Sequence, residues 1–112
     1  MDSGIELWKR YLLEREDAIL YYEEHGFVTY MLKGDYAYIL EIYVVPEKRN
    51  EGNCRRISEV VEGIIKEKGY KAVSCGVCTS ANNWERSLAV IKIGGYKEFK
   101  REDDMIYLIK NL

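Results

Sequence analysis

The hydrophobic and polar positions of the chain follow two periods, one typical of strands and one typical of helices. The longest strand signal covers residues 36–45, where β-branched and aromatic side chains surround a single charge, Glu41. Such a run is typical of a strand that is buried on both faces of a sheet. Pro46 ends the predicted strand, because proline cannot donate a hydrogen bond to a sheet ladder.

A helix is predicted directly after this strand, from about residue 55 to residue 68. Its apolar residues recur at i, i+3, i+4, i+7 and i+8, which forms one inward-facing stripe. The stripe consists of Ile57, Val60, Val61, Ile64 and Ile65. Gly69 stands where a helix favours a left-handed residue at its C-terminus. Strand, proline and helix together form the central unit of the predicted fold.

The loop between this strand and this helix is a candidate anion site. Its backbone N–H groups would lie beside a helix N-terminus, and that arrangement binds phosphate-sized anions. Basic side chains surround the loop, namely Lys48, Arg49, Arg55 and Arg56. The pattern predicts a device that binds the phosphates of a cofactor.

Shorter signals divide the rest of the chain. Ser3 and Glu6 have the spacing of a capping box that opens a first helix, and His25-Gly26 and Gly34-Asp35 read as turns between strands. The strand after the central helix should lie parallel to the long strand, because a crossover helix joins them. Asn82 and Asn83 are helix-capping residue types. The predicted order is α-β-β-β-α-β-α-β-β, at residues 3–16, 18–23, 27–33, 36–45, 55–68, 71–77, 84–93, 96–101 and 105–110.

This order predicts an α/β (α+β) fold with a mixed, mostly antiparallel sheet. A chain of 112 residues is long enough for one core and not for two, so a single domain over residues 1–112 is expected. No run approaches the 18 apolar residues of a membrane span, and no signal peptide precedes the first helix. A soluble, cytoplasmic protein without a membrane partner is therefore expected.

Cysteines and charges narrow the possible partners. All three cysteines are expected to be reduced and buried, and the Cys75/Cys78 pair lacks the further ligands of a zinc site, so no metal is expected. Residues 1–47 hold 4 basic and 10 acidic side chains, a balance of −6, whereas residues 48–112 hold 13 and 9, a balance of +4. The candidate anion loop lies in the positive half. Nucleic acid is not expected as a partner, because no helix or stripe is basic.

The order of elements and the central loop resemble the GNAT superfamily of acyl-CoA-dependent N-acetyltransferases. The family motif R-x-x-G-x-G/A is similar to residues 49–54, Arg-Asn-Glu-Gly-Asn-Cys, which follow a strand and a proline. A second family landmark, an asparagine-led helix that ends at Gly-aromatic, is matched by Asn82-Asn83 through Gly95-Tyr96. Residues 87–96 are similar to small members that bacteriophages encode. The usual first strand and one early helix are absent from this chain.

The resemblance implies transfer of an acetyl group from acetyl-CoA to a primary amine by direct attack. Within this mechanism Glu41, the only charge of the long strand, is expected to accept the proton of the amine. The alternative is that Glu41 is solvated or paired with a lysine and has no catalytic role. The same mechanism offers Tyr43 as the proton donor to the thiolate, because the family tyrosine is replaced by Val90 or Ile91. The residues expected to bind coenzyme A are Val44, Val45, Arg49, Asn50, Glu51, Gly52, Asn53, Cys54, Arg55, Arg56, Asn82 and Asn83.

Two positions depart from the family motif. Cys54 stands where glycine or alanine is usual, and Asn53 stands where an apolar residue is usual. These departures leave open a catalytically weak or inert CoA-binding regulatory module, and also an interaction protein without a CoA site. The acceptor could be a small amine, a lysine or an N-terminal amine, and the acidic first half would attract a cationic one. The shortened N-terminus favours a homodimer.

Overall fold

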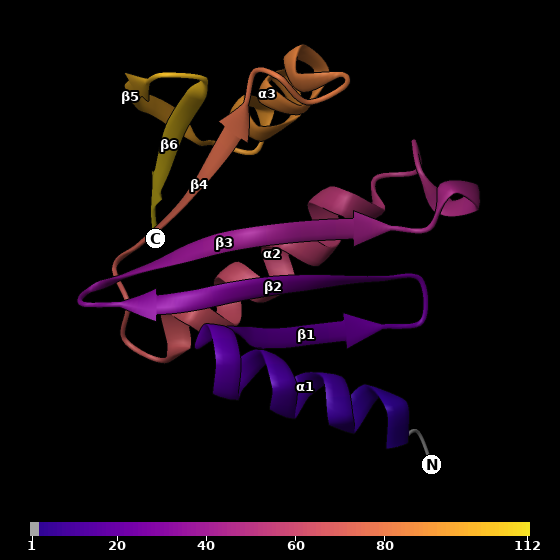
Figure 1. Ribbon diagram of the computed structural model, residues 1–112. Helices are drawn as coiled ribbons and strands as arrows, with labels where there is room; N and C mark the ends of the chain where they lie inside the picture. The colour runs from indigo at the N-terminus through magenta and orange to yellow at the C-terminus, as the bar shows by residue number, and fades with distance from the viewer. Residues whose placement is uncertain (1–2) are drawn as a thin grey trace.

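The elements of the protein follow the predicted order in a computed structural model that describes residues 3–112 (Figure 1). Three helices, a short 3-10 helix and six strands are present among these residues. Their bounds are α1 Ser3–Glu16, β1 Ile19–Glu23, β2 Gly26–Lys33, β3 Tyr36–Val44, η1 Pro46–Lys48, α2 Asn53–Glu67, β4 Ala72–Cys78, α3 Trp84–Ile93, β5 Lys97–Glu102 and β6 Met105–Asn111. The side chain of Ser3 lies outside the described part, so the capping box stays a prediction.

The strands form one mixed sheet in the order β1-β2-β3-β4-β6-β5. β1, β2 and β3 form an antiparallel meander, β3 pairs with β4 in parallel, and β6 pairs antiparallel with both β4 and β5. The meander, the parallel pair and the closing hairpin are all as predicted. β6 lies between β4 and β5, so that the last strand of the chain, and not the one before it, pairs with β4.

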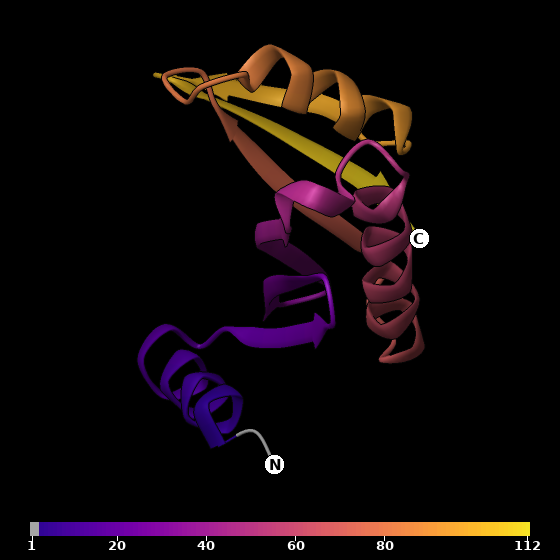
Figure 2. The ribbon, with the colours of Figure 1, turned by 90° about the vertical axis from the view of Figure 1, so that its right-hand side faces the viewer.

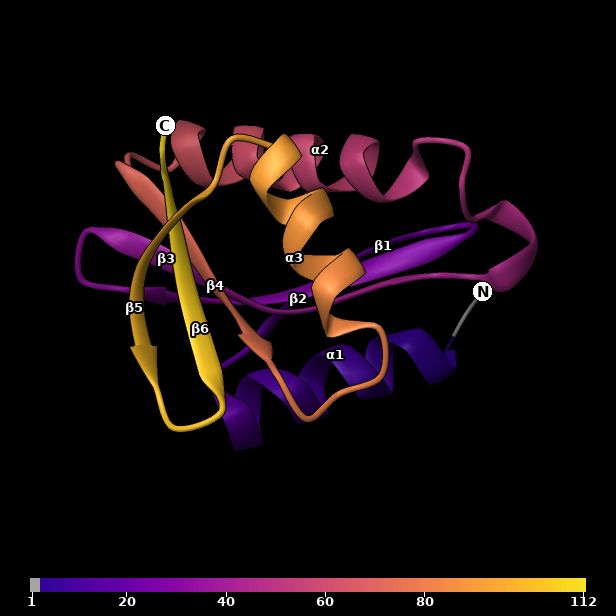
Figure 3. The same ribbon diagram turned by 90° about the horizontal axis from the view of Figure 1, so that it is seen from above.

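The helices cover the two faces of the sheet unequally. α2 and α3 lie on one face, where Ile57, Val61 and Ile65 are fully buried against the sheet and Leu88 and Ile91 pack beside them (Figure 3). α1 lies on the other face (Figure 2) and covers only β1 and β2, through a smaller cluster around Leu12, Ala18 and Leu20. No helix in the described part of the chain covers the α1-side face of β4, β6 and β5.

This unequal cover corrects the prediction that residues 36–45 are buried on both faces. Ala37, Ile39 and Val44 are buried under α2, but Glu41 and Tyr43 on the opposite face are exposed. The run looks fully buried in the sequence because its outward positions carry tyrosine and leucine. Val60 was predicted to lie on the apolar stripe of α2, but 38% of its surface is accessible, so it lies outside the buried face of that helix.

β3 and β4 pair over only part of their length. The parallel register joins Tyr36–Ile39 of β3 to Ala72–Cys75 of β4, and the two strands diverge beyond that point (Figure 1). A bulge at Leu40, where the pairing of β3 with β2 shifts register, bends β3 at the same place. Past Ile39, the edge of β3 that faces β4 therefore has backbone N–H and C=O groups without strand partners. α2 starts after the free end of β3, and α3 starts after the free end of β4.

A buried polar cluster ties α2 to the C-terminal strands. Glu62, only 7% exposed, accepts hydrogen bonds from the Tyr96 hydroxyl at 2.7 Å and from the Lys110 ammonium at 2.8 Å. Burial, followed by the hydrogen bond to Glu62, raises the pKa of Tyr96 far above its usual value. Burial also raises the pKa of the nearby Cys75 thiol to about 12. The cluster satisfies the carboxylate in the core and fixes Tyr96 after the Gly94-Gly95 turn.

Candidate functional site

The loop before α2 has the backbone of an anion site. Asn50 and Gly52 both adopt left-handed conformations, with φ of 62° and 81°, and no side chain caps the N-terminus of α2 at Gly52. A Cβ atom at Gly52 would meet nothing within 4 Å. The first N–H groups of α2 therefore point into open space beside a turned-back loop, and such an arrangement attracts anions.

Two side chains hold this loop in shape. Asn53 Nδ2 donates to the Lys48 carbonyl at 2.9 Å, which closes the loop across five residues. Arg49 Nε donates to the Val44 carbonyl at 2.8 Å, and its guanidinium lies 5.4 Å from the centre of the Tyr43 ring. The polar residue at position 53, a departure from the family motif, therefore has a structural purpose that the sequence did not reveal.

The N-terminus of α3 is a second uncapped helix start. Asn83 occupies the cap position with a left-handed φ of 59°, but its side chain makes no capping hydrogen bond. Asn83 thus stands at the N-cap, as expected of a helix-capping residue type, but without the side-chain hydrogen bond of such a cap. The left-handed backbone needs a residue such as asparagine, which tolerates that conformation. Both helix starts leave N–H groups open at the end of the sheet where β3 and β4 diverge.

Arg86 connects the two helix starts. Its guanidinium donates a hydrogen bond to the Asn50 side-chain carbonyl, from the first turn of α3 to the loop before α2. This contact adds a third segment of chain, and a cation, to the candidate anion site. Arg86 was not among the residues predicted from the sequence. Its distance of four residues from Asn82 could have indicated a place on the first turn of α3.

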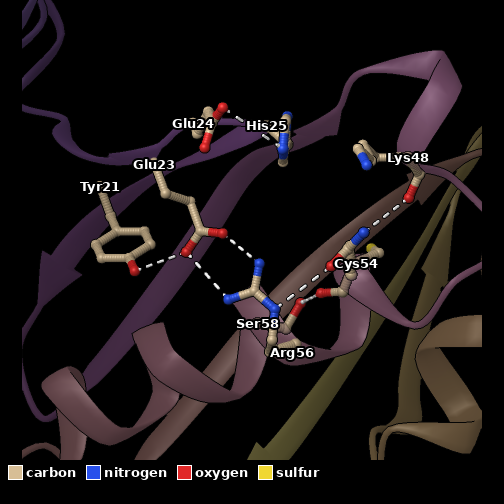
Figure 4. A network of polar contacts seen from close by, with 9 residues as sticks. Tyr21, Glu23, Glu24, His25, Lys48, Cys54, Arg56 and Ser58 are labelled. Atoms are coloured by element: carbon tan, nitrogen blue, oxygen red, sulfur yellow. Dashed lines mark hydrogen bonds and ion pairs between the residues drawn. The ribbon is translucent and has the colours of Figure 1, made fainter.

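Arg56, predicted to bind coenzyme A, is paired inside the protein (Figure 4). Its guanidinium forms an ion pair and two hydrogen bonds with the Glu23 carboxylate at the end of β1. Tyr21 donates to the same carboxylate at 2.9 Å. The hydrogen bond from Arg56 lowers the pKa of Glu23. The contact directs Arg56 toward the β1–β2 hairpin, while Arg55 has no hydrogen-bond or ion-pair partner among residues 3–112. A cofactor role for either residue stays a prediction.

Glu41 and Tyr43 lie together on the face of β3 that α1 shares. In the register with β2, Glu41 is opposite Thr29 and Tyr43 is opposite Phe27. The Tyr43 ring stacks on Phe27 with centroids 5.6 Å apart. Glu41 is exposed and makes no hydrogen bond or ion pair with another residue of the described chain, as in the solvated alternative, and its role as proton acceptor stays a prediction. It lies on the diverging part of β3, two residues beyond the last parallel pair.

A second tyrosine, Tyr38, lies beside the point where the strands diverge. Gly76, the first residue of β4 beyond the parallel pairs, has no side chain, and a Cβ there would lie 2.7 Å from the Tyr38 hydroxyl. Burial raises the pKa of Tyr38, so its hydroxyl stays protonated as a donor. Within residues 3–112, no group accepts or donates a hydrogen bond to that hydroxyl. Tyr38 was not among the residues predicted from the sequence, because the alternation of apolar and polar positions along a strand does not show which hydroxyl lies at a site.

The cysteines differ in their surroundings. Cys75 is buried as predicted, but Cys54 is exposed at the start of α2, which corrects the prediction that all three are buried. Cys78 lies 3.0 Å from the Ser80 hydroxyl and 3.5 Å from a carboxylate oxygen of Asp104. No group of three or more His, Cys, Asp or Glu residues between positions 3 and 112 is placed to hold a metal ion. Over the same residues, no helix is both long and apolar enough to cross a membrane.

Neither a protein-family model nor a curated protein sequence matches the chain. Solved structures match it over almost its whole length. PaiA N-acetyltransferase of Thermoplasma acidophilum in complex with coenzyme A has a TM-score of 0.77 at 15% identity, covering 98% of this chain and 72% of that chain. A GNAT family acetyltransferase of Elizabethkingia anophelis with acetyl-CoA bound has a TM-score of 0.74 at 20% identity, covering 96% and 82%. This chain has the GNAT acetyltransferase fold.

A Bacillus subtilis acetyltransferase in complex with CoA extends the comparison, with a TM-score of 0.72 at 16% identity, covering 99% of this chain and 86% of that chain. These structures confirm the predicted GNAT-like fold class. The sequence identity between this chain and neighbours of similar TM-score is only 14 to 20%. The similarity to members encoded by bacteriophages stays a prediction.

Proposed function

We propose that this protein transfers an acetyl group from acetyl-CoA to a primary amine. The observation that carries the proposal is the pair of uncapped helix N-termini at the end of a sheet whose β3 and β4 strands diverge. Structural neighbours with coenzyme A or acetyl-CoA bound support the same cofactor here. When bound, acetyl-CoA supplies an activated thioester, so that the amine nitrogen bonds the acetyl carbon as the carbon–sulfur bond breaks.

The residues of the loop fit the phosphate groups of coenzyme A. The N–H groups of residues 51–55 and 83–85 would bind phosphate oxygens, with Arg55 and Arg86 adding positive charge. The Arg56 N–H already donates to the Gly52 carbonyl. The unpaired edge of β3 before Val44 would hydrogen-bond the amides of the pantetheine arm as an added strand would. Val44 and Val45 border this edge, but the Val44 carbonyl already accepts from Arg49, and Val45 bonds His25 and Lys48 through its own backbone. Cys54 contributes its backbone N–H, so its departure from the family motif keeps this role.

The catalytic roles proposed for this chain fall to residues on β3. An amine acceptor carries a proton at neutral pH, since its unperturbed pKa is about 10.4 if it resembles lysine. Glu41, exposed and unpaired, accepts that proton directly or through water. Tyr43 or Tyr38 donates a proton to the leaving thiolate, and Tyr38 is the phenol beside the point of divergence. Backbone N–H groups of the bulged strand polarise the thioester carbonyl.

The cofactor assignment is tested by Gly52→Val, with Gly34→Val as a matched control. Both glycines have left-handed φ, 81° and 59°, and neither has an atom within 4 Å of the added Cβ, so both variants carry a similar backbone strain of about 1–2 kcal/mol. Only Gly52 adjoins the proposed phosphate site. Titration calorimetry with acetyl-CoA should show at least a tenfold weaker affinity for Gly52→Val and unchanged affinity for Gly34→Val. Equal affinities in the two variants would remove the loop from the cofactor site.

The catalytic base is tested by Glu41→Gln in a pH–rate profile with an accepted amine. General-base catalysis contributes about 10²- to 10⁴-fold, so kcat/KM should fall by that order at neutral pH. The loss should shrink as pH rises toward the pKa of the amine, because the free amine needs no base. A variant whose acidic limb matches that of the wild type would exclude Glu41 from proton transfer.

One alternative function uses the same fold without catalysis. The absence of a tyrosine at Val90 and Ile91 of α3 favours a CoA-binding regulatory module. Tight binding of acetyl-CoA without acetylation of any amine in a library that includes small amines, lysine peptides and N-terminal peptides would establish that alternative. A homodimer and a cytoplasmic location also stay predictions, the first testable by analytical ultracentrifugation.

A further inference from the structure

The sheet face turned away from α2 and α3 contains an open pocket of about 390 Å³. This volume lies in the range of about 300–1,000 Å³ that is usual for small-molecule sites. No helix among residues 3–112 covers the pocket. Its apolar lining consists of Tyr36 and Tyr38 from β3, Tyr107 and Ile109 from β6, and Phe99 from β5.

The shape of the pocket follows from the sizes of alternate side chains. On this face β4 carries only small residues, namely Ala72, Ser74, Gly76 and Cys78. The strands on both sides of β4 carry aromatic or long aliphatic side chains in register with them, such as Tyr38 and Ile109 opposite Ser74. β4 therefore forms a low floor between two high walls at Ser74, whereas the Tyr38 hydroxyl and the Met105 side chain lie over Gly76. Phe99 extends one wall, with its ring 6.5 Å from that of Tyr107 and 57% of its surface exposed.

The charges around the pocket are arranged along its length. Glu41 lies on the diverging part of β3, on the same face as Tyr38, and Asp104 lies beside Cys78 at the far end of β4. Lys100, the cation in the pocket lining, pairs with Glu102 at 3.0 Å and lies 5.9 Å from the centre of the Tyr107 ring. The lining itself is apolar or aromatic apart from Ser74 and Lys100, and Glu41 is the carboxylate that follows the lining residue Tyr38 on this face of β3.

We propose that this pocket receives the acceptor and that the acceptor is a primary amine carrying an aromatic ring. The inference rests on the proposed acetyltransferase function and names its substrate class. The ring lies against Tyr107 and Phe99, since aromatic side chains favour offset or edge-to-face contact with another ring. The ammonium group then points toward Glu41 and Asp104, where the strands diverge and the thioester is expected.

A second copy of the chain is a less suitable occupant of the same face. In a two-fold dimer each patch meets its own copy, so the carboxylates around Glu41 and Asp104 would gather at one interface. The concave floor along β4 would also leave a flat partner without contact. The charge pattern and the shape both favour a small cation with an apolar body.

The test compares 2-phenylethylamine with ethylamine, which lacks the ring, and with 2-phenylethanol, which lacks the charge. Nuclear magnetic resonance of the full chain with labelled Phe and Tyr rings reports binding without any need for turnover. Partial burial of one phenyl ring should give about a tenfold tighter Kd for 2-phenylethylamine than for ethylamine. Phe99→Ala should remove most of that difference. Tyr22→Ala, which removes an exposed aromatic residue from the opposite edge strand β1, should leave it unchanged.

The outcomes separate this inference from the proposed function. Binding of acetyl-CoA together with ring-dependent binding of the amine, lost in Phe99→Ala, supports both. If acetyl-CoA binds but the two amines bind with equal affinity, the aromatic acceptor is wrong and the proposed transferase function stands. The same holds if Phe99→Ala and Tyr22→Ala have equal effects. If the amine binds in a ring-dependent way but acetyl-CoA does not bind, the pocket is a binding site for aromatic amines and the proposed transferase function is wrong. A dimer that Phe99→Ala dissociates would assign this face to a second copy and overturn the inference.

Discussion

The surroundings of each carboxylate determine what it can do in this protein, and Glu62 is the clearest case. It stands on the apolar stripe of α2, where an isolated carboxylate would be costly to bury. Tyr96 and Lys110 satisfy its two oxygens from the end of α3 and from β6. Glu41 on β3 is the opposite case, because it is exposed and unpaired among the described residues. One carboxylate is used for packing, and the other is available for chemistry.

Removal of the Tyr96 hydroxyl should destabilise the fold without affecting coenzyme A. Tyr96→Phe leaves one oxygen of buried Glu62 without its partner, so unfolding in urea should show a loss of about 1.5–3 kcal/mol. Because the pKa of Tyr96 is raised in the folded state, its stabilising effect is complete below pH 10 and is lost as the pH rises further. The variant should therefore lose less stability than the wild type above pH 10. Tyr22→Phe, an exposed control, should change neither quantity, and a Tyr96→Phe effect below 0.5 kcal/mol would contradict the proposed role.

At the scale of elements, the start of α2 divides its basic residues between two tasks. Arg56 ties the helix to β1 through Glu23 (Figure 4), whereas the Arg55 side chain has no hydrogen-bond or ion-pair partner in the described chain. Sequence position cannot make this distinction, because the residues are adjacent and the partner of Arg56 lies 33 residues earlier. The helix period separates their directions by about 100°. The α2 N-terminus should therefore respond differently to the loss of each arginine.

Arg55→Ala should weaken acetyl-CoA binding by roughly tenfold, the effect of one charge-assisted hydrogen bond, and leave stability unchanged. Arg56→Ala should do the reverse and lower the stability slightly, since the ion pair with Glu23 is partly exposed. The lowered pKa of Glu23 means that this stabilisation is present above pH 4.5 and is lost as the pH falls below it. Calorimetric titration and urea unfolding at pH 7 and pH 3.5 measure both effects. A larger loss of acetyl-CoA affinity in Arg56→Ala than in Arg55→Ala would reverse the assignment.

The comparison of elements also shows which features the sequence could predict. Periodicity located every helix and strand to within about two residues, because each buries one face and is bounded by glycine, proline or asparagine. The one-sided burial of β3 could not be predicted, since it depends on where α1 lies. The hydrogen bonds of Asn53 and Arg86 were also out of reach, because each joins the loop to a position that only the tertiary fold brings near. Local sequence patterns therefore predicted where the site lies, but contacts between distant residues determine which side chains form it.

At the scale of the whole molecule, two parts of the sheet meet along a short parallel pairing. The radius of gyration is 14.1 Å, somewhat above the roughly 13 Å expected for a compact chain of this length. The excess agrees with the divergence of β4, β6 and β5 from β1, β2 and β3 beyond Ile39 (Figure 1). A ligand that extends from the two helix N-termini to this point would contact both parts of the sheet.

Hydrogen exchange should therefore show protection by CoA on both sides of the divergence. Residues 40–44 of β3 and 76–78 of β4 should exchange more slowly with CoA bound, as should residues 50–56 and 83–87, because N–H groups in each segment that lack an acceptor gain one. Residues 19–33 should change only by the global stabilisation, which is about 2.7 kcal/mol at 100 times the Kd. Mass spectrometry of peptides from the full chain measures all these segments in one experiment. Protection that includes residues 50–56 and omits residues 76–78 would mean that the ligand stays on the loop and does not enter between the strands.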